Sequence, residues 1–147
     1  MIPIIMSDYI LTTGDIAMFN PPFGQAIVTV IPGNIVGSSK NMINKKMVCV
    51  DGDEKSVIVP GCPYMTPSHP IPGVGILSID SLAPNQKALR TKCNGKPVLL
   101  KGSTFKAKFQ VVVPAQQPTP GGPVPDPTPQ YSGTGSFITT NFRVKGT

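Results

Sequence analysis

The chain has 147 residues and a formal net charge of +6, with 15 Gly, 18 Pro and only 14% charged residues. This length predicts one domain with one modest core. The low charge content argues against a charged disordered chain or a long-helix protein, and the abundant Gly and Pro favour many short strands joined by tight turns.

The sequence predicts neither a transmembrane segment nor a signal peptide. No stretch approaches the roughly 18 apolar residues of a membrane span. Residues 1–6 are apolar, but they are few and no basic region precedes them, so we expect no export by the general secretory route. The 13 Lys and Arg residues are spread singly and Trp is absent, which favours a solvated basic surface over a nucleic-acid-binding one.

Residues 8–115 read as a succession of short β elements that end at turn signals such as Pro-Gly and Asp-Gly. The first predicted strands cover residues 26–31, 47–50, 56–59, 75–79 and 98–100. Residues 104–113 then alternate, with Phe105, Ala107, Phe109 and Val111 on one face and Lys106, Lys108 and Gln110 on the other. One or two helical turns are expected over 85–91. The predicted fold class is mostly β.

A weak internal repeat links two of these elements. Residues 44–53 and 94–103 share the frame N-x-K-x-V-x-x-x-G at an offset of 50 residues. A repeated turn–strand–turn unit indicates internal pseudo-symmetry, in which one unit is too small to bury its own face. Chance similarity between two turn segments is the alternative.

The composition changes after Ala115. Residues 116–130 hold six prolines, and Val124 is their only large apolar residue, so an extended, polyproline-like connector is expected. Residues 136–145 then have the composition of a strand, with Ile138, Thr140, Phe142 and Val144 on one face. A lone strand is not stable, so this tail pairs with the body, pairs with a partner chain or remains loose. The predicted organisation is a β body over 1–115, a connector over 116–130 and a strand tail over 131–147.

Three cysteines and one histidine are the candidate metal ligands. An odd number of cysteines fits a disulfide framework poorly. Three thiolates and one imidazole suit tetrahedral structural zinc. All four residues lie in or beside predicted turns, from which ligands of separate hairpins can converge: Cys49, Cys62, His69 and Cys93. The alternative is three buried thiols and a surface histidine.

The sequence supports a catalytic site less well than a metal site. A Cys–His pair with His69 lacks an orienting third group. The acids Asp51, Asp53 and Glu54 lack the spacing of a calcium loop, so a solvated hairpin is favoured. No GxxxxGK[ST] motif offers a phosphate cradle. An enzyme is therefore not expected, and no catalytic residue is assigned.

Several segments resemble PAAR-repeat proteins. Residues 35–53 resemble the repeating unit: an apolar pair, Gly-Ser, an Asn-containing turn, and a strand ending in Gly-Asp. Residues 13–15 resemble the first Gly-Asp of the pattern, and residues 93–103 resemble a later copy. Residues 67–75 and 113–118 resemble the PAAR-like variant encoded with contractile injection systems, a class that includes type VI secretion systems and phage-tail-like particles. The Pro-Ala-Ala-Arg tetrapeptide is absent, and residues 87–90 resemble it only distantly.

The resemblance implies a spike tip. It implies a small cone of short β-hairpins with pseudo-threefold symmetry, one per trimeric VgrG-like spike, that sharpens the spike for puncturing a target membrane when the sheath contracts. It also implies one structural zinc ion per chain, held by Cys49, Cys62, His69 and Cys93. Better-known members use more His ligands. The tail after residue 130 is too short for a toxin domain.

The implied location is the cytoplasm until assembly, and afterwards the outside of the cell or the interior of the target cell. Neither a nucleic acid nor a small-molecule substrate is expected. Two alternatives remain: a free-standing zinc-binding β module that binds protein or nucleic acid, and a Cys-dependent enzyme. Neither alternative explains the internal repeat.

Overall fold

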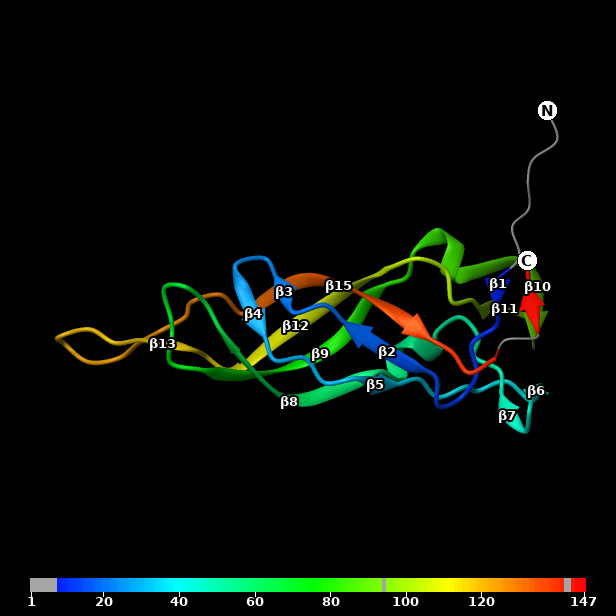
Figure 1. The fold of residues 1–147 in the computed structure, drawn as a ribbon, viewed down its shortest axis with the longest axis horizontal. Coiled ribbons are helices and arrows are strands. Elements are labelled where there is room, and N and C mark those ends of the chain that lie inside the picture. The colour runs from blue at the N-terminus through cyan, green and yellow to red at the C-terminus, as the bar shows by residue number, and fades with distance from the viewer. Residues whose placement is uncertain (1–7, 94, 142–143) are drawn as a thin grey trace, which may run out of the picture.

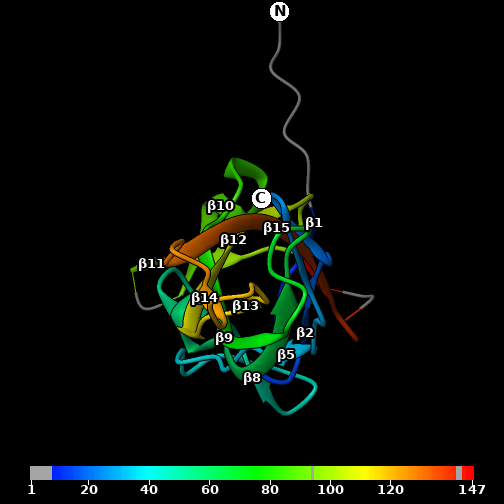
Figure 2. The same cartoon turned by 90° about the vertical axis from the view of Figure 1, so that its left-hand side faces the viewer.

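The computed structural model describes residues 8–93, 95–141 and 144–147. This part of the chain is elongated, with a narrow end and a broad end (Figure 1). An antiparallel sheet of eight strands forms the body and curls around the long axis (Figure 2). Its spatial order is β3 (Pro22–Phe23), β4 (Ala26–Val28), β8 (Ile58–Met65), β9 (Gly73–Ser81), β12 (Phe105–Val113), β15 (Gln130–Ile138), β2 (Ile16–Phe19) and β5 (Gly33–Asn34).

Four two-stranded ladders complete the fold. One ladder, β13 (Gln116–Gln117) with β14 (Val124–Pro125), lies at the narrow end (Figures 1 and 2). The other three lie at the broad end: β1 (Asp8–Tyr9) with β16 (Lys145–Gly146), β6 (Met42–Ile43) with β7 (Lys46–Met47), and β10 (Lys87–Cys93) with β11 (Lys96–Leu99). The helices described are two short 3₁₀ turns, η1 (Asp53–Ser56) and η2 (Pro84–Gln86). Across the described ranges, no helix has the length and apolar character to cross a membrane.

The main core lies on the inner face of the curled sheet. The alternation predicted for residues 104–113 is confirmed, because Phe105, Ala107 and Phe109 are buried while Lys106 and Gln110 are exposed. Aromatic rings from neighbouring strands meet there. The Phe105 ring centroid is 5.0 Å from that of Phe137, and the Phe109 centroid is 5.1 Å from that of Tyr64. Such ring pairs add to the free energy of burial.

Gly75 on β9 shows how closely the rings pack on the backbone. A Cβ atom at this position would lie 2.4 Å from the Phe109 ring and 2.5 Å from the Gln110 carbonyl oxygen. Both distances are far below van der Waals contact, so glycine lets the ring rest directly on the strand.

The predicted strand 56–59 continues through its turn signal. Its Pro60-Gly61 dipeptide lies inside β8, where the register with β9 shifts between Val59 and Cys62. Gly61 has a φ of 74°, which fits an irregular residue within a bulge. A turn signal in the sequence therefore became a bulge in a longer strand.

The helix predicted over 85–91 does not form. Only the 3₁₀ turn η2 is present there, and β10 follows it directly because its backbone pairs with β11. The buried Gln86 side chain fixes the turn: its Oε1 accepts a hydrogen bond from the Ala83 N–H at 2.8 Å. Tertiary pairing has overridden a weak helical preference.

The C-terminal part of the chain belongs to the body. Strand β15 lies between β12 and β2 in the sheet, and the proline-rich segment before it folds back as the β13–β14 ladder. The buried face of β15 carries Tyr131 and Phe137, whereas Ile138 is 49% exposed. The predicted apolar face is therefore reversed for Ile138, and Phe142 of the same predicted face lies outside the described residues.

The mostly-β class is confirmed, but the predicted cone of short hairpins differs from the body that forms. Strands β9, β12 and β15 have nine residues each and pair side by side, so they build one long curled sheet. At the broad end, three short two-stranded ladders meet instead.

Candidate functional site

Three segments at the broad end share one local pattern. Each has three consecutive residues in extended pairing, one further residue and then a glycine: residues 10–14, 48–52 and 98–102. We call these three segments the hub. Their glycines have φ values of 93° (Gly14), 100° (Gly52) and 55° (Gly102), in the left-handed region where glycine is favoured. Two of the segments belong to the predicted repeat, and the third contains the Gly-Asp noted near the start of the chain.

The central residues of the hub form a closed ring of backbone hydrogen bonds. The Leu11 N–H donates to the Leu99 oxygen at 2.9 Å, the Leu99 N–H donates to the Cys49 oxygen at 2.9 Å, and the Cys49 N–H donates to the Leu11 oxygen at 3.0 Å. Each residue therefore donates to one neighbour and accepts from the other.

A second ring of hydrogen bonds surrounds the first and runs in the opposite sense. Its three bonds join Thr13 N–H to Met47 O at 2.9 Å, Asp51 N–H to Pro97 O at 2.8 Å, and Lys101 N–H to Tyr9 O at 2.9 Å. Each segment thus pairs with one partner along its first half and with the other partner along its second half. The hub is closed, because all three segments bind both of the others.

Each hub segment is preceded by a strand with an antiparallel partner, and the three registers correspond. Met42 faces Met47 in the first ladder, Lys92 faces Pro97 in the second, and Lys145 faces Tyr9 in the third. The first two ladders are hairpins with tight turns; Asn44 and Lys45 have φ values of 52° and 66°, and Gly95 has 76°. The third ladder joins strands from opposite ends of the sequence.

The hub side chains divide between two cores. Leu11, Cys49 and Leu99 are fully buried and belong to the main core of the sheet. Their flanking residues form most of a second, smaller core at the broad end: Ile10, Val48, Val50, Ala88, Cys93, Val98 and Leu100. This alternation is the period-two pattern of extended strands, and it holds the hub rigidly on the end of the sheet.

Two aspartates close the turns that follow the hub strands. Asp15 Oδ2 accepts the Thr12 N–H at 2.8 Å, and Asp53 Oδ2 accepts the Val50 N–H, also at 2.8 Å. Asp15 is 1% exposed and its Oδ2 also accepts the Thr139 hydroxyl at 2.6 Å. The acidic cluster predicted as a solvated hairpin therefore contains one residue, Asp53, that braces the hub.

The structure distributes the four predicted zinc ligands over different parts of the fold. Cys49 is a hub residue, Cys62 lies on β8, and Cys93 lies at the end of β10, where its Sγ accepts a hydrogen bond from the Asn41 amide at 2.9 Å. His69 lies between β8 and β9, and its Nδ1 is 3.2 Å from the Thr66 hydroxyl. Burial raises the pKa of the Cys49 thiol, and Asp53 and Asp15 raise it further. Burial also raises the pKa of Cys62.

Within the described ranges, no group of three or more His, Cys, Asp or Glu side chains is arranged to hold a metal ion. The residues do not fit a four-ligand zinc site in this arrangement. The zinc ion stays a prediction from the sequence.

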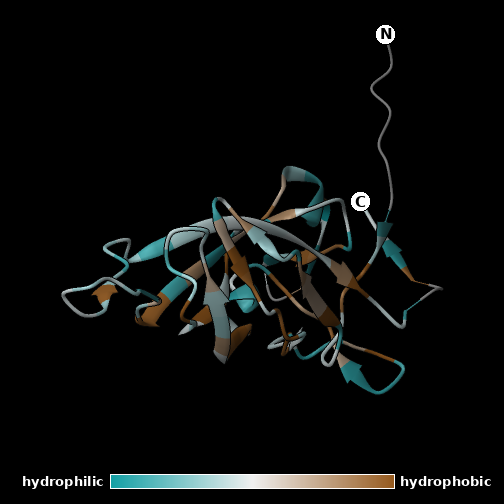
Figure 3. Ribbon diagram, turned by 60° about the vertical axis from the view of Figure 1, so that its left-hand side comes forward, coloured by the Kyte–Doolittle hydropathy of each residue, from teal (hydrophilic) through white to brown (hydrophobic). Residues whose placement is uncertain are grey.

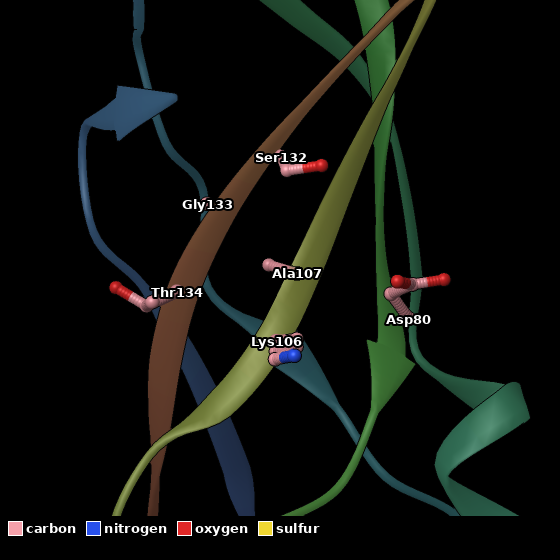
Figure 4. A pocket seen from close by; sticks show the side chains of 6 residues that line it. All are labelled: Asp80, Lys106, Ala107, Ser132, Gly133 and Thr134. Atoms are coloured by element: carbon pink, nitrogen blue, oxygen red, sulfur yellow. The ribbon is translucent and has the colours of Figure 1, made fainter. Parts of the chain in front are cut away.

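A shallow hollow lies between β9, β12 and β15 (Figure 4). Its lining residues are Asp80, Lys106, Ala107, Ser132, Gly133 and Thr134. This set offers one carboxylate and one ammonium group on an open surface, without a nucleophile paired to a base. The hollow is therefore not a candidate active site.

A β body that ends in a closed junction of three strands is the architecture of a structural protein. The comparison with known families agrees with this class. Residues 6–147 match the family described as "Contractile injection system spike tip protein", so the chain belongs to this family. A comparison with curated proteins finds no match. The protein is a spike tip protein of a contractile injection system, a structural component of the injection particle and not an enzyme.

Sequence reasoning found two of the three hub segments but missed how they join. The signal was available, because residues 10–15, 48–53 and 98–103 all place a glycine four residues after an aliphatic residue. The three short patterns form one junction only because segments more than 80 residues apart, such as those of Ile10 and Leu100, pair with each other. A local motif does not reveal such a pairing.

Proposed function

We propose that the broad end docks on the blunt end of a trimeric, VgrG-like spike, one tip per trimer, and that the narrow end leads during sheath contraction. This is the PAAR-like arrangement that the sequence resemblance implies. The observation that carries the proposal is the closed double ring of hydrogen bonds in the hub. Three corresponding segments that pair in a cycle are related by a pseudo-threefold axis.

A pseudo-threefold axis would allow a single tip chain to bind three identical spike chains in similar ways. One chain has no exact symmetry, while a cyclic trimer presents the same edge three times. The three ladders around the hub, β6–β7, β10–β11 and β16–β1, offer one similar strand edge to each spike chain. Pairing of such edges by β-augmentation supplies backbone hydrogen bonds that depend little on side-chain identity.

The elongated body supports a mechanical role. The hub is continuous with the main core through Leu11, Cys49 and Leu99, so force applied at the broad end passes into the long sheet strands without a hinge. Tightly packed interiors have low compressibility and transmit strain. The target membrane is the transient partner, and the tip acts by its shape and stiffness.

Native mass spectrometry of the protein mixed with the trimeric spike protein of the same system tests this proposal. The expected complex contains one tip and three spike chains. A variant that lacks residues 145–147 removes β16 and with it the third ladder, so it is expected to lose the complex while circular dichroism still reports the β fold. Val124→Lys on β14 is the control, because it places a charge at the narrow end and leaves the hub intact.

A complex with another stoichiometry, or one that the narrow-end control abolishes and the hub variant does not, would contradict the proposal. The same spectra give the mass of any metal carried by the free chain. They therefore decide separately on the predicted zinc ion.

A further inference from the structure

The formal charges of the molecule are distributed very unevenly along its length. Three segments build the narrow end: residues 21–31, 62–75 and 109–130, which we call the narrow segments. None of the 13 Lys and Arg residues lies in them, and their only acidic residue is Asp126. At the broad end, by contrast, exposed lysines occupy all three ladders, at Lys46, Lys96 and Lys145.

The one carboxylate of the narrow segments is withdrawn from the surface. Asp126 is 6% exposed, and its Oδ2 accepts hydrogen bonds from the hydroxyls of Tyr64 at 2.9 Å and Tyr131 at 2.7 Å. Its Oδ1 accepts the Thr128 N–H at 3.0 Å. Burial alone would raise the pKa of this carboxyl, but the hydrogen bonds from Tyr131, Thr128 and Tyr64 outweigh it and lower the pKa. The Asp126 carboxylate therefore joins Tyr64, Tyr131 and Thr128 through buried hydrogen bonds, and we call this group of four residues the brace.

The surface of the narrow segments carries exposed aliphatic side chains that no Lys or Arg of the same segments accompanies. Seven of its large aliphatic side chains are between 40% and 60% exposed: Ile27, Ile31, Met65, Ile71, Val112, Val113 and Val124. Ile27 and Met65 face each other across β4 and β8, so part of this surface is continuous. Hydrophobic stretches occur at both ends in Figure 3, and at the broad end the β6–β7 hairpin combines exposed Met42 and Met47 with polar turn residues. The two ends therefore differ in charge and not in the presence of exposed apolar side chains.

The backbone of the narrow segments is also poor in hydrogen-bond donors. They contain 13 of the 18 prolines, each of which lacks an N–H group. Unpaired backbone polar groups and charges both oppose entry into a lipid bilayer. The absence of Lys and Arg and the reduced number of N–H groups in the narrow segments therefore suit a low-dielectric medium.

We infer that the narrow end is a lipid-contacting surface that partitions into the interface of a bilayer without requiring anionic headgroups. The exposed aliphatic side chains supply the favourable transfer from water. The narrow segments themselves contain no lysine to bind a headgroup by charge, and the nearest one in sequence, Lys108, precedes the third segment and is half-buried. The inference rests on the proposed function in one respect, because it takes the broad end to be covered by the spike. The narrow end of the free protein has the same surface, so lipid contact is measurable without the spike.

Single-tryptophan variants test the inference, since the chain has no Trp of its own. Val124→Trp places the reporter on β14 at the narrow end, and Leu89→Trp places it at an 82% exposed position on β10 at the broad end. With phosphatidylcholine vesicles, the emission of Val124→Trp is expected to shift to the blue and to be quenched by brominated acyl chains, at low and high salt alike. Leu89→Trp is expected to stay unshifted.

A matched pair of charge variants gives a second, independent measurement by vesicle co-sedimentation. Val112→Lys and Val36→Lys make the same change at two exposed valines, of which Val112 belongs to the narrow segments and Val36 does not. Val112→Lys is expected to lower the fraction bound to phosphatidylcholine vesicles by roughly tenfold or more, because a lysine must be dehydrated in the bilayer. Val36→Lys is expected to bind as the unmodified protein does.

Three results would overturn the inference. The first is an absence of vesicle binding, and the second is binding only to anionic vesicles that salt abolishes, which would assign the contact to the basic broad end. The third is a blue shift of Val124→Trp without vesicles that grows with protein concentration, which would make a second copy of the chain the occupant. Repeating the measurement on the tip–spike complex separates the two proposals, because native mass spectrometry reports docking regardless of whether lipid binds.

Discussion

The broad end and the narrow end are stabilised by different kinds of interaction. At the broad end, three strand segments are joined by a double ring of backbone hydrogen bonds, and their side chains enter two cores. At the narrow end, two tyrosine hydroxyls hold one buried aspartate, and the Tyr64 oxygen also accepts the Ala115 N–H at 2.9 Å. In the function proposed above, the broad end has to keep three backbone edges in register for docking, whereas the narrow end has to keep a slender shape without presenting charge.

The largest expected loss of stability comes from truncating a hub side chain that is buried in the main core. Leu99→Ala removes a fully buried side chain at the centre of the inner ring and should lower the free energy of unfolding by about 3–5 kcal/mol. Leu89→Ala is the matched control, because Leu89 is 82% exposed and its loss should change stability very little. Urea denaturation of both variants checks this expectation. Equal effects would mean that the hub contributes no more than the surface of β10.

The brace at the narrow end should contribute less. Asp126→Ala leaves two buried tyrosine hydroxyls and the Thr128 N–H without their acceptor, and we expect a loss of about 2 kcal/mol. Asp80→Ala, at an exposed position on β9, is the control and should be close to neutral. Thermal denaturation of the two variants measures the difference.

The brace also predicts a pH dependence. Because the pKa of Asp126 is lowered in the folded protein, its contribution is fully present above the ordinary aspartate pKa of about 3.9. It is lost as the pH falls through the lower, folded-state pKa. The stability difference between the unmodified protein and Asp126→Asn should therefore shrink on acidification below about pH 4. A difference that stays constant down to pH 2 would show that the charge of Asp126 is not what the hydrogen bonds stabilise.

A smaller effect is expected at the third ladder. The Thr91 hydroxyl accepts the Thr147 N–H at 3.0 Å and so anchors the strand that pairs with β1. Thr91→Val should cost about 1 kcal/mol and, through a partly opened ladder, should weaken binding to the spike by up to about tenfold. Thr119→Val removes a comparable hydroxyl, which donates to the Gly122 carbonyl, at the narrow end. It should leave spike binding unchanged, and titration of the spike with both variants measures the contrast.

The smallest expected effect concerns metal. Because the described arrangement does not group the predicted ligands, a zinc chelator should leave the melting temperature of the protein unchanged. A chelator-induced fall in melting temperature, reversed by added zinc and absent from Cys93→Ser, would show that the four residues converge on an ion after all. Differential scanning fluorimetry with and without zinc makes this measurement.

The parts of the fold that sequence predicts well are those governed by local pattern. The alternation along β12 identifies the inward-facing Phe105 and Phe109, because side chains on a strand alternate regardless of which strand lies beside it. Strand β15 shows the limit of this reasoning. Its sequence offers apolar residues on both faces, and only its position between β12 and β2 selects Phe137 for the core and exposes Ile138.

The candidate site was only half predictable for a similar reason. The repeat around Val48 and Val98 is visible in the sequence, but the ring they join also needs Leu11 and closes through pairs remote in the chain. Donor chemistry, turn positions and the family resemblance led to the prediction of Cys49 as a zinc ligand, and in the structure Cys49 lies in the main core. A buried cysteine and a ligand cysteine have the same sequence signature when no close spacing distinguishes them.

The pairing of β1 with β16 has a consequence for the timing of assembly. Asp8 pairs with Gly146, so one of the three ladders stays incomplete on the ribosome until nearly the last residue of the sequence shown has been synthesised. Contacts this distant in sequence form late, because a long loop must be closed first. A nascent or truncated chain would present two completed ladders instead of three. If the ladders dock as proposed, such a chain would lack one of the three edges that the spike binds.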